Sequence, residues 1–290
     1  KGKLFFMKNN SAIYYMIFSV LAFAIMNAVV KYLHGFSVYQ IVFFRAIGTL
    51  LFTVPLILKN RIPVLGNNKK LLLFRGVLGV FSLTCFFQTI QYLPMGTAVS
   101  LRYTSPIFAV IFAAIFLKER IQLVQWFLFG VAFVGVLIIK GFGAGIQPIG
   151  LLFAFLSAVS LGLIFVVIRK IGTTENPFII INYFMVLALI FGGVLSINTW
   201  SNPDFLEFLL LLSLGVFGYV GQLYMTKAFQ ANETNAIAPL KYLEVVFTII
   251  IGVSWFGEIY NGWTLLGVFL ILLGLFYNLF VNKKSSAGKK

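Results

Sequence analysis

Three ionisable side chains lie in segments of the sequence that are otherwise apolar: Arg102, Lys241 and Glu244. An ionisable group at the centre of a bilayer costs at least about 2.5–3.5 kcal/mol on insertion scales, so such groups usually face a cavity or a partner. Two cations that face one cavity attract an anion, and the guanidinium of arginine suits bidentate binding of carboxylate or phosphate. If these segments cross a membrane, we expect Arg102 and Lys241 to line a central cavity that accepts an organic anion.

A structural role for the same three residues is the alternative. Arg102 could bind backbone carbonyl groups, and Lys241 stands three residues before Glu244, a spacing at which helical side chains pair. Glu244 is the one carboxylate well inside an apolar segment. For Glu244 we favour an ion pair with Lys241 over a proton-coupling role. Glu244 has both roles if a bound substrate breaks this ion pair.

Further polar residues lie in the same apolar segments or in others. Tyr103 and Tyr242 adjoin the two cations and offer hydroxyl groups, whereas Asn27 and Gln88 either line the cavity or bond between helices. The full set of cavity candidates is Arg102, Lys241, Tyr103, Tyr242, Glu244, Asn27 and Gln88.

Three more cations are expected outside the cavity. Arg45 has intermediate depth, which favours a supporting or interfacial role over substrate contact. Arg75 and Lys227 lie nearer segment ends, and we expect their heads to extend to the cytoplasmic interface.

Composition places these residues in a membrane. The chain has 290 residues, of which 61% are apolar and 10% are charged, and its mean hydropathy is +1.02. A soluble domain usually carries about 25% charged residues. Runs of about 20 apolar residues are long enough to span a bilayer as helices. Ten such runs predict an all-α integral membrane protein: Ala12–Val30, Val38–Leu58, Leu71–Tyr92, Met95–Leu117, Gln122–Ile139, Gly150–Ile168, Pro177–Ile197, Phe205–Phe229, Asn235–Phe256 and Trp263–Val281.

The net charge of +15 follows from the predicted topology. With the N-terminus in the cytoplasm, the inner segments hold fifteen Lys and Arg residues, and the outer segments hold only Lys31 and Lys140. This asymmetry agrees with the positive-inside rule, so no nucleic-acid partner is needed to explain the charge. We expect a multi-pass protein of the plasma (inner) membrane with both termini in the cytoplasm.

The two halves of the chain resemble each other. When 71–119 is compared with 210–258 at a shift of 139 residues, 12 of 49 positions are identical, and Arg102 meets Lys241. The first spans align at a shift of 138, which pairs Ser19 with Ser157. Five-helix repeats at 11–139 and 150–281 would enter the membrane in opposite orientations, as in many secondary transporters. The matched glycines are expected to serve close helix packing: Gly76, Gly79, Gly215 and Gly218.

This pattern resembles the drug/metabolite transporter superfamily and, within it, the EamA-type family. The residues that carry the resemblance are Arg45, the stretch Arg102-Tyr103-Thr104-Ser105-Pro106, and the matched Glu119 and Glu258. The resemblance implies a central cavity lined by spans one to four and six to nine. It also implies a secondary transporter of a small metabolite by alternating access. Its expected partners are that substrate, the lipid bilayer, and a coupling proton or counter-substrate. The sequence does not decide whether the protein forms a homodimer.

The alternatives are an efflux carrier for amino acids or drugs, a channel, or a membrane protein without transport activity. We expect no enzyme, cofactor or metal site. The single histidine, His34, lies in an expected outer loop, and the sequence has no HExxH or GxSxG motif. The single cysteine, Cys85, sits in an apolar run, where packing is its expected role.

Overall fold

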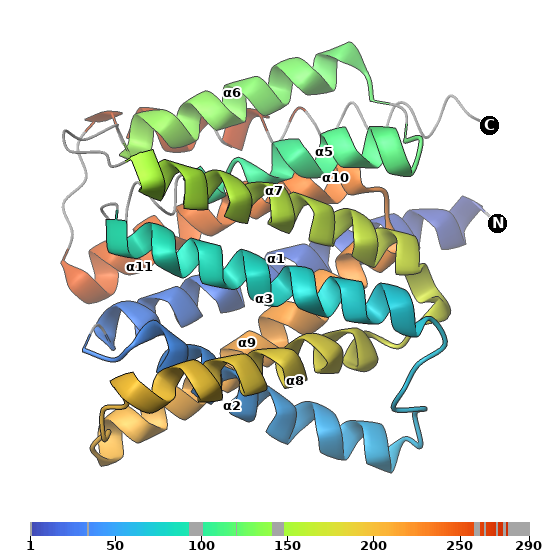
Figure 1. The fold of residues 1–290 in the computed structure, drawn as a ribbon. Helices are drawn as coiled ribbons and strands as arrows, with labels where there is room; N and C mark the ends of the chain where they lie inside the picture. The colour runs from blue at the N-terminus through green and yellow to red at the C-terminus, as the bar shows by residue number, and fades with distance from the viewer. Residues whose placement is uncertain are drawn as a thin grey trace. The chain divides into compact units, whose positions relative to one another are not determined.

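The computed structural model describes residues 2–33, 35–92, 101–119, 121–140, 148–257 and the short stretches 262–263, 265–270, 272–274 and 277. The regular elements of these residues are all helices (Figure 1), as the apolar runs predict. Helices satisfy every backbone hydrogen bond within one segment, which a lipid environment requires. Their bounds are α1 Gly2–Tyr32, α2 Val38–Lys59, α3 Lys69–Tyr92, α5 Ser105–Phe116, α6 Leu123–Lys140, α7 Pro148–Ile171, η1 Gly172–Thr174, α8 Pro177–Ser196, η2 Ile197–Thr199, α9 Phe205–Ala231, α10 Thr234–Ile237, η3 Ala238–Tyr242 and α11 Leu243–Phe256.

Six helical segments of the described residues are long and apolar enough to cross a membrane. They correspond to the first, second, sixth, seventh, eighth and ninth predicted spans: Ser11–Tyr32, Val38–Lys59, Pro148–Thr174, Pro177–Thr199, Phe205–Ala231 and Ala238–Phe256. Shorter apolar helices cover parts of the fourth, fifth and tenth spans, and α3 covers the third. The count of ten therefore stays a prediction.

Side chains at the loops explain where several helices begin and end. The Ser37 hydroxyl accepts a hydrogen bond from the Gln40 amide and caps α2. The Asn176 side chain caps α8 in the same way, and Pro177, which lacks an N–H, occupies the first helical position. Gly257 ends α11 with a φ of 62°, a conformation that glycine adopts without strain.

The chain forms two compact units that differ from the predicted repeats. The first unit consists of residues 1–80 and 170–231, and the second of residues 81–169 and 232–290. Each unit takes segments from both repeats, 11–139 and 150–281, and the divisions fall inside α3 and α7. The repeats describe sequence correspondence rather than packing, and they stay a prediction.

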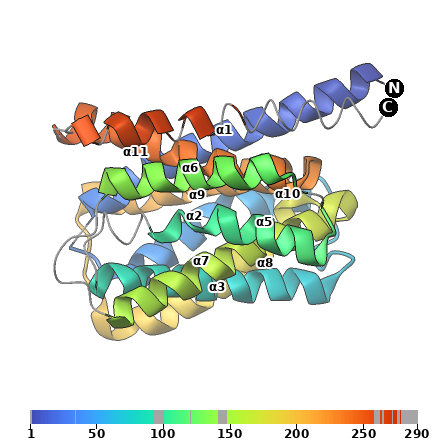
Figure 2. The same ribbon diagram turned by 90° about the horizontal axis from the view of Figure 1, so that it is seen from above.

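The second unit is held together by close helix contacts and paired hydroxyl groups. In this unit α5 lies beside α7 (Figure 2), where a Cβ added at Gly162 would be 2.8 Å from the Ala109 nitrogen. The Ser82 and Ser157 hydroxyls each donate to the other residue's carbonyl oxygen, at 3.0 and 2.9 Å. Small residues and hydroxyl bonds of this kind are typical of helix packing in membranes.

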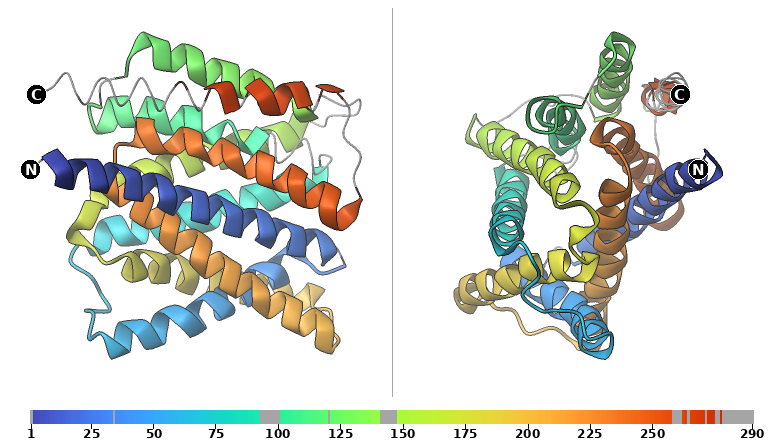
Figure 3. Two further views of the ribbon diagram at one scale, coloured as in Figure 1. Left: turned by 180° about the vertical axis from the view of Figure 1, so that it is seen from behind. Right: turned by 90° about the vertical axis from the view of Figure 1, so that its right-hand side faces the viewer.

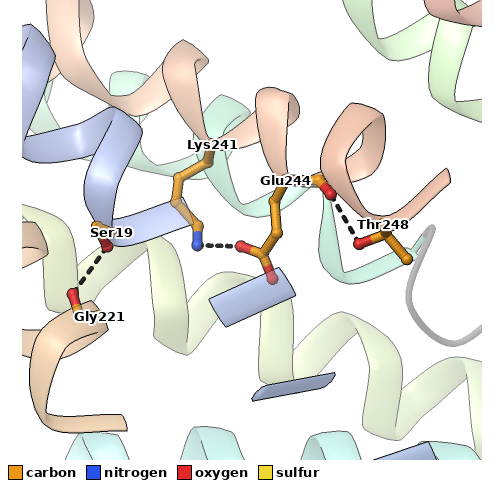
Figure 4. Close-up of polar contacts among 5 residues, drawn as sticks. All are labelled: Ser19, Gly221, Lys241, Glu244 and Thr248. Carbon is orange, nitrogen blue, oxygen red and sulfur yellow. Dashed lines mark hydrogen bonds and ion pairs between the residues drawn. The ribbon is translucent and has the colours of Figure 1, made fainter. Parts of the chain in front are cut away.

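The first unit packs α1 across α9 and α2 against α8 and α9 (Figure 3). A Cβ added at Gly215 would lie 2.2 Å from the Gly48 Cα, so only glycine allows α2 and α9 this approach. A Cβ at Gly76 would lie 3.1 Å from the Tyr183 carbonyl oxygen. The Ser19 hydroxyl donates to the Gly221 carbonyl at 2.8 Å (Figure 4). The expected packing role of Gly76 and Gly215 is confirmed.

Candidate functional site

The ninth predicted span is interrupted rather than continuous, which corrects the expectation of one helix over Asn235–Phe256. The short helix α10 ends at Ile237, η3 covers Ala238–Tyr242, and α11 begins at Leu243. Pro239 lies in the first turn of η3. Proline lacks the N–H that a continuous helix needs and its ring clashes with the preceding turn, so the helix breaks here.

The fourth predicted span, Met95–Leu117, is interrupted at the matching place. Residues 101–102 are helical, Tyr103 and Thr104 form a turn, and α5 begins at Ser105 with Pro106 in its first turn. Residues 93–100 of this span lie outside the described residues. Because the 139-residue shift places Tyr103 opposite Tyr242, the two interruptions correspond. Broken helices of this kind line substrate sites in many transporters.

A buried ion pair crosses the junction between η3 and α11 (Figure 4). Lys241 Nζ donates to Glu244 Oε2, and both residues are 7% exposed. The Thr248 hydroxyl donates to the Glu244 carbonyl oxygen at 2.7 Å, which ties this residue to the next helical turn. The ion pair expected from the three-residue spacing is therefore present.

Arg102 and Tyr103 join this ion pair within the second unit. Glu244 lies close enough to both residues to interact with them electrostatically. The Arg102 guanidinium carbon stacks 4.0 Å from the centre of the Phe86 ring, a cation–π contact. The structure thus brings two cations and one carboxylate together in a mainly apolar surrounding, where charges interact more strongly than in water.

The remaining cavity candidates are Tyr242, Gln88 and Asn27. Tyr242 follows Lys241 in the chain and is fully buried, and its hydroxyl has no hydrogen-bond partner among the described residues. Gln88 is half-buried on α3 in the second unit. Asn27 is half-buried on α1 in the first unit.

Two residues of the group were not predicted from the sequence. Phe86 is one of 34 phenylalanines, and nothing in the sequence distinguishes it from those that pack or face lipid. Thr248 carries a weak signal, since a hydroxyl four residues after Glu244 can reach its carbonyl group on a helix.

The structure also corrects one expectation about the peripheral cations. Arg75 is only 1% exposed, so its head does not extend to an interface. Its long side chain turns into the first unit, where α8 and α9 cover it. Arg45 is buried as well, at 8% exposure, while Lys227 is half-buried and lies 5.8 Å above the Tyr15 ring.

The sequence of the chain resembles those of known membrane transporters. A sequence profile of the EamA-like transporter family matches residues 10–141 and again residues 148–280. The chain belongs to the EamA-like transporter family. As an EamA-like transporter with long apolar helices, it is a multi-pass membrane protein.

Among relatives of this EamA-like protein, the pseudopaline exporter CntI of Pseudomonas aeruginosa is 32% identical over 91% of this chain and 94% of its own length. The S-adenosylmethionine uptake transporter of Rickettsia bellii is 26% identical over 89% of this chain and 88% of its own length. Human solute carrier family 35 member G1 is 27% identical over 90% of this chain and 76% of its own length. A crystal structure with 16% identity matches the fold with a TM-score of 0.84, covering 93% of this chain and 98% of that chain.

Proposed function

We propose that this EamA-like transporter is a secondary active carrier of a small metabolite that bears at least one carboxylate or phosphate group. The observation that carries this proposal is the group formed by half-buried Arg102 and the buried pair of Lys241 and Glu244, beside two matched helix interruptions. The group holds two positive side chains and one negative side chain. An anionic substrate would balance the second cation.

The proposed transport mechanism is that an acid group of the substrate replaces the Glu244 carboxylate as the partner of Lys241. Glu244 neutralises Lys241 when no substrate is bound. An incoming acid group competes with Glu244 for Lys241 and bonds to Arg102, whose planar N–H donors match carboxylate geometry. The buried hydroxyls of Tyr103 and Tyr242 are further donors. Glu244, once released, takes up a coupling proton or pairs with a counter-substrate.

Matched contacts support the inverted repeat that alternating access uses. Ser19 bonds to the Gly221 carbonyl in the first unit, and Ser157 bonds to the Ser82 carbonyl in the second. The sequence alignment pairs Ser19 with Ser157 at a shift of 138, and Ser82 with Gly221 at a shift of 139. The same hydrogen bond therefore recurs at corresponding places. We infer two five-helix repeats that exchange conformations to open the site to each side in turn.

Export is the direction favoured by one relative. The pseudopaline exporter shares 32% identity with this chain, whereas the S-adenosylmethionine uptake transporter shares 26%. An efflux carrier for amino acids or drugs is therefore the second candidate function. Both candidates are carriers, and the second fixes the direction as export and extends the substrates to drugs.

Transport in proteoliposomes tests the carrier function. Purified protein is reconstituted, loaded with an unlabelled candidate, and exposed to trace amounts of the same radiolabelled compound, beginning with S-adenosylmethionine, amino acids and small organic acids. A carrier exchanges the two pools, so label accumulates transiently above its external concentration. Equilibration without such an overshoot for every transported compound would indicate a channel and contradict the proposal.

The charge asymmetry also predicts where the linker between the repeats lies. In a Cys85→Ala background, a cysteine introduced at Gly143 should react with a membrane-impermeant maleimide added outside intact cells. The reason is that a topology with both termini in the cytoplasm puts fifteen basic residues on the inner side and only two on the outer side, as the positive-inside rule favours. A cysteine at Asn67, in the α2–α3 loop, is the matched inner control. Reaction of the Gly143 position only after the cells are opened would refute this topology.

A further inference from the structure

The first unit encloses an arginine that the transport site above does not use. Arg75 lies on the part of α3 that belongs to this unit and is 1% exposed. Its Nη2 donates to Gln222 Oε1 of α9 at 3.0 Å, and its guanidinium carbon lies 4.5 Å from the centre of the Phe184 ring of α8. Two helices thus hold the guanidinium in a fixed position.

Two of the three guanidinium nitrogens of Arg75 form no hydrogen bond to the part of the chain that the structure describes. These are Nε and Nη1, and both are buried. Within the described ranges Arg75 takes part in no ion pair, and the charged group that acts on it is a second cation, Arg45 of α2. A buried charge is normally paired, because removing it from water is expensive unless attraction and hydrogen bonds compensate.

Glycines make room for both arginines in this unit. A Cβ added at Gly79 would lie 2.9 Å from Arg75 Nη1 and 2.6 Å from Phe184 Cδ2. A Cβ added at Gly218 would lie 3.1 Å from Arg45 Nε. Gly79 and Gly218 correspond at the 139-residue shift, so each repeat places a glycine against an arginine side chain. This arrangement accommodates charge, which goes beyond the packing role expected of these glycines.

We propose that Arg75 and Gln222 form a second anion-binding site, within the first unit, for a carboxylate or phosphate oxyanion. The anion accepts hydrogen bonds in the guanidinium plane from one N–H of Nη2 and from the neighbouring Nε or Nη1, while Phe184 stays stacked on the guanidinium face and Gln222 accepts from the other N–H of Nη2. Arg45 adds attraction from α2. The site is closed off in this conformation, and the anion's entry when the helices part rests on the alternating access proposed above.

The test measures thermal stability of the full-length protein in phosphatidylcholine nanodiscs at constant ionic strength, with and without inorganic phosphate. The background is the double variant Arg102→Gln/Lys241→Gln, which removes the cations of the other site. Phosphate should raise its melting temperature, because a ligand that binds only the folded state stabilises it. Adding Arg75→Gln should weaken the apparent phosphate affinity by roughly ten- to a hundredfold. Arg75→Lys, which keeps the positive charge, should weaken the apparent phosphate affinity less than Arg75→Gln does.

Lys227→Gln is the matched control, since it removes one cation that stacks on aromatic rings in the same unit. It should leave the phosphate response unchanged. A response that survives Arg75→Gln, or no response of the double variant to phosphate, would overturn the site. If the phosphate response is instead equal in wild type and double variant, Arg102 and Lys241 do not bind inorganic phosphate and this site stands. An Arg75-dependent stabilisation by phosphatidylglycerol in phosphate-free nanodiscs supports the same site with a lipid headgroup as its ligand.

Discussion

Replacing Arg102 or Lys241 by glutamine is expected to weaken binding of an acidic substrate by roughly ten- to a hundredfold. The reason is the loss of a charge-assisted hydrogen bond, worth about 1.5–3 kcal/mol. Glu244 pairs with Lys241 and interacts electrostatically with Arg102 in the second unit. Each substitution therefore also removes a positive charge that offsets the charge of this carboxylate. The effect is measured as the concentration dependence of exchange in proteoliposomes.

Control variants separate substrate binding from structure. Lys59→Gln removes an exposed cation at the end of α2 and should exchange substrate as the wild type does. Lys241→Gln leaves Glu244 without its partner and should alter the pH dependence of transport, whereas Lys241→Gln/Glu244→Gln should restore the pH dependence but not anion affinity. Normal transport by both single cation variants, with lower melting temperatures, would assign Arg102 and Lys241 a purely structural role.

A second large effect is expected at the contact between α2 and α9. Gly215→Leu should prevent folding of the first unit, and Gly215→Ala should destabilise it by about 3 kcal/mol, the upper end of the range for overpacking. The added Cβ would meet the backbone of α2, 2.2 Å from the Gly48 Cα and 2.8 Å from the Thr49 nitrogen, and backbone cannot move aside as a side chain can. Thermostability monitored by size-exclusion chromatography measures the change.

Gly130→Ala on α6 provides the comparison, because nothing lies within 4 Å of a Cβ added there. It should match the wild type in yield and melting temperature. A Gly215→Ala protein as stable as Gly130→Ala would show that α2 and α9 do not approach this closely.

Composition and charge predicted much of this fold because a bilayer leaves few alternatives. Apolar runs must form helices there, and caps such as Ser37 and Asn176 mark their starts. The interruption at η3 was not predicted, because a count of apolar residues does not register a broken helix. Proline is also tolerated in many continuous membrane helices, so Pro239 alone was ambiguous.

The candidate site, too, was predicted from the sequence only in part. Ionisable residues are rare in apolar segments, so Arg102, Lys241 and Glu244 stood out by type and position. The burial of Arg75 could not be predicted from its type and position in the sequence. Sequence position gives the distance of a residue from a helix end, but not which neighbouring helices cover its side chain.

The most direct test of the central claim is a structure of the protein with a transported acid bound. Our account predicts that an oxygen of the acid group lies at hydrogen-bonding distance, roughly 2.7–3.2 Å, from Lys241 Nζ and from the Arg102 guanidinium. It also predicts that the ion pair between Lys241 and Glu244 is parted. A bound substrate that leaves this ion pair intact and contacts neither cation would contradict the account.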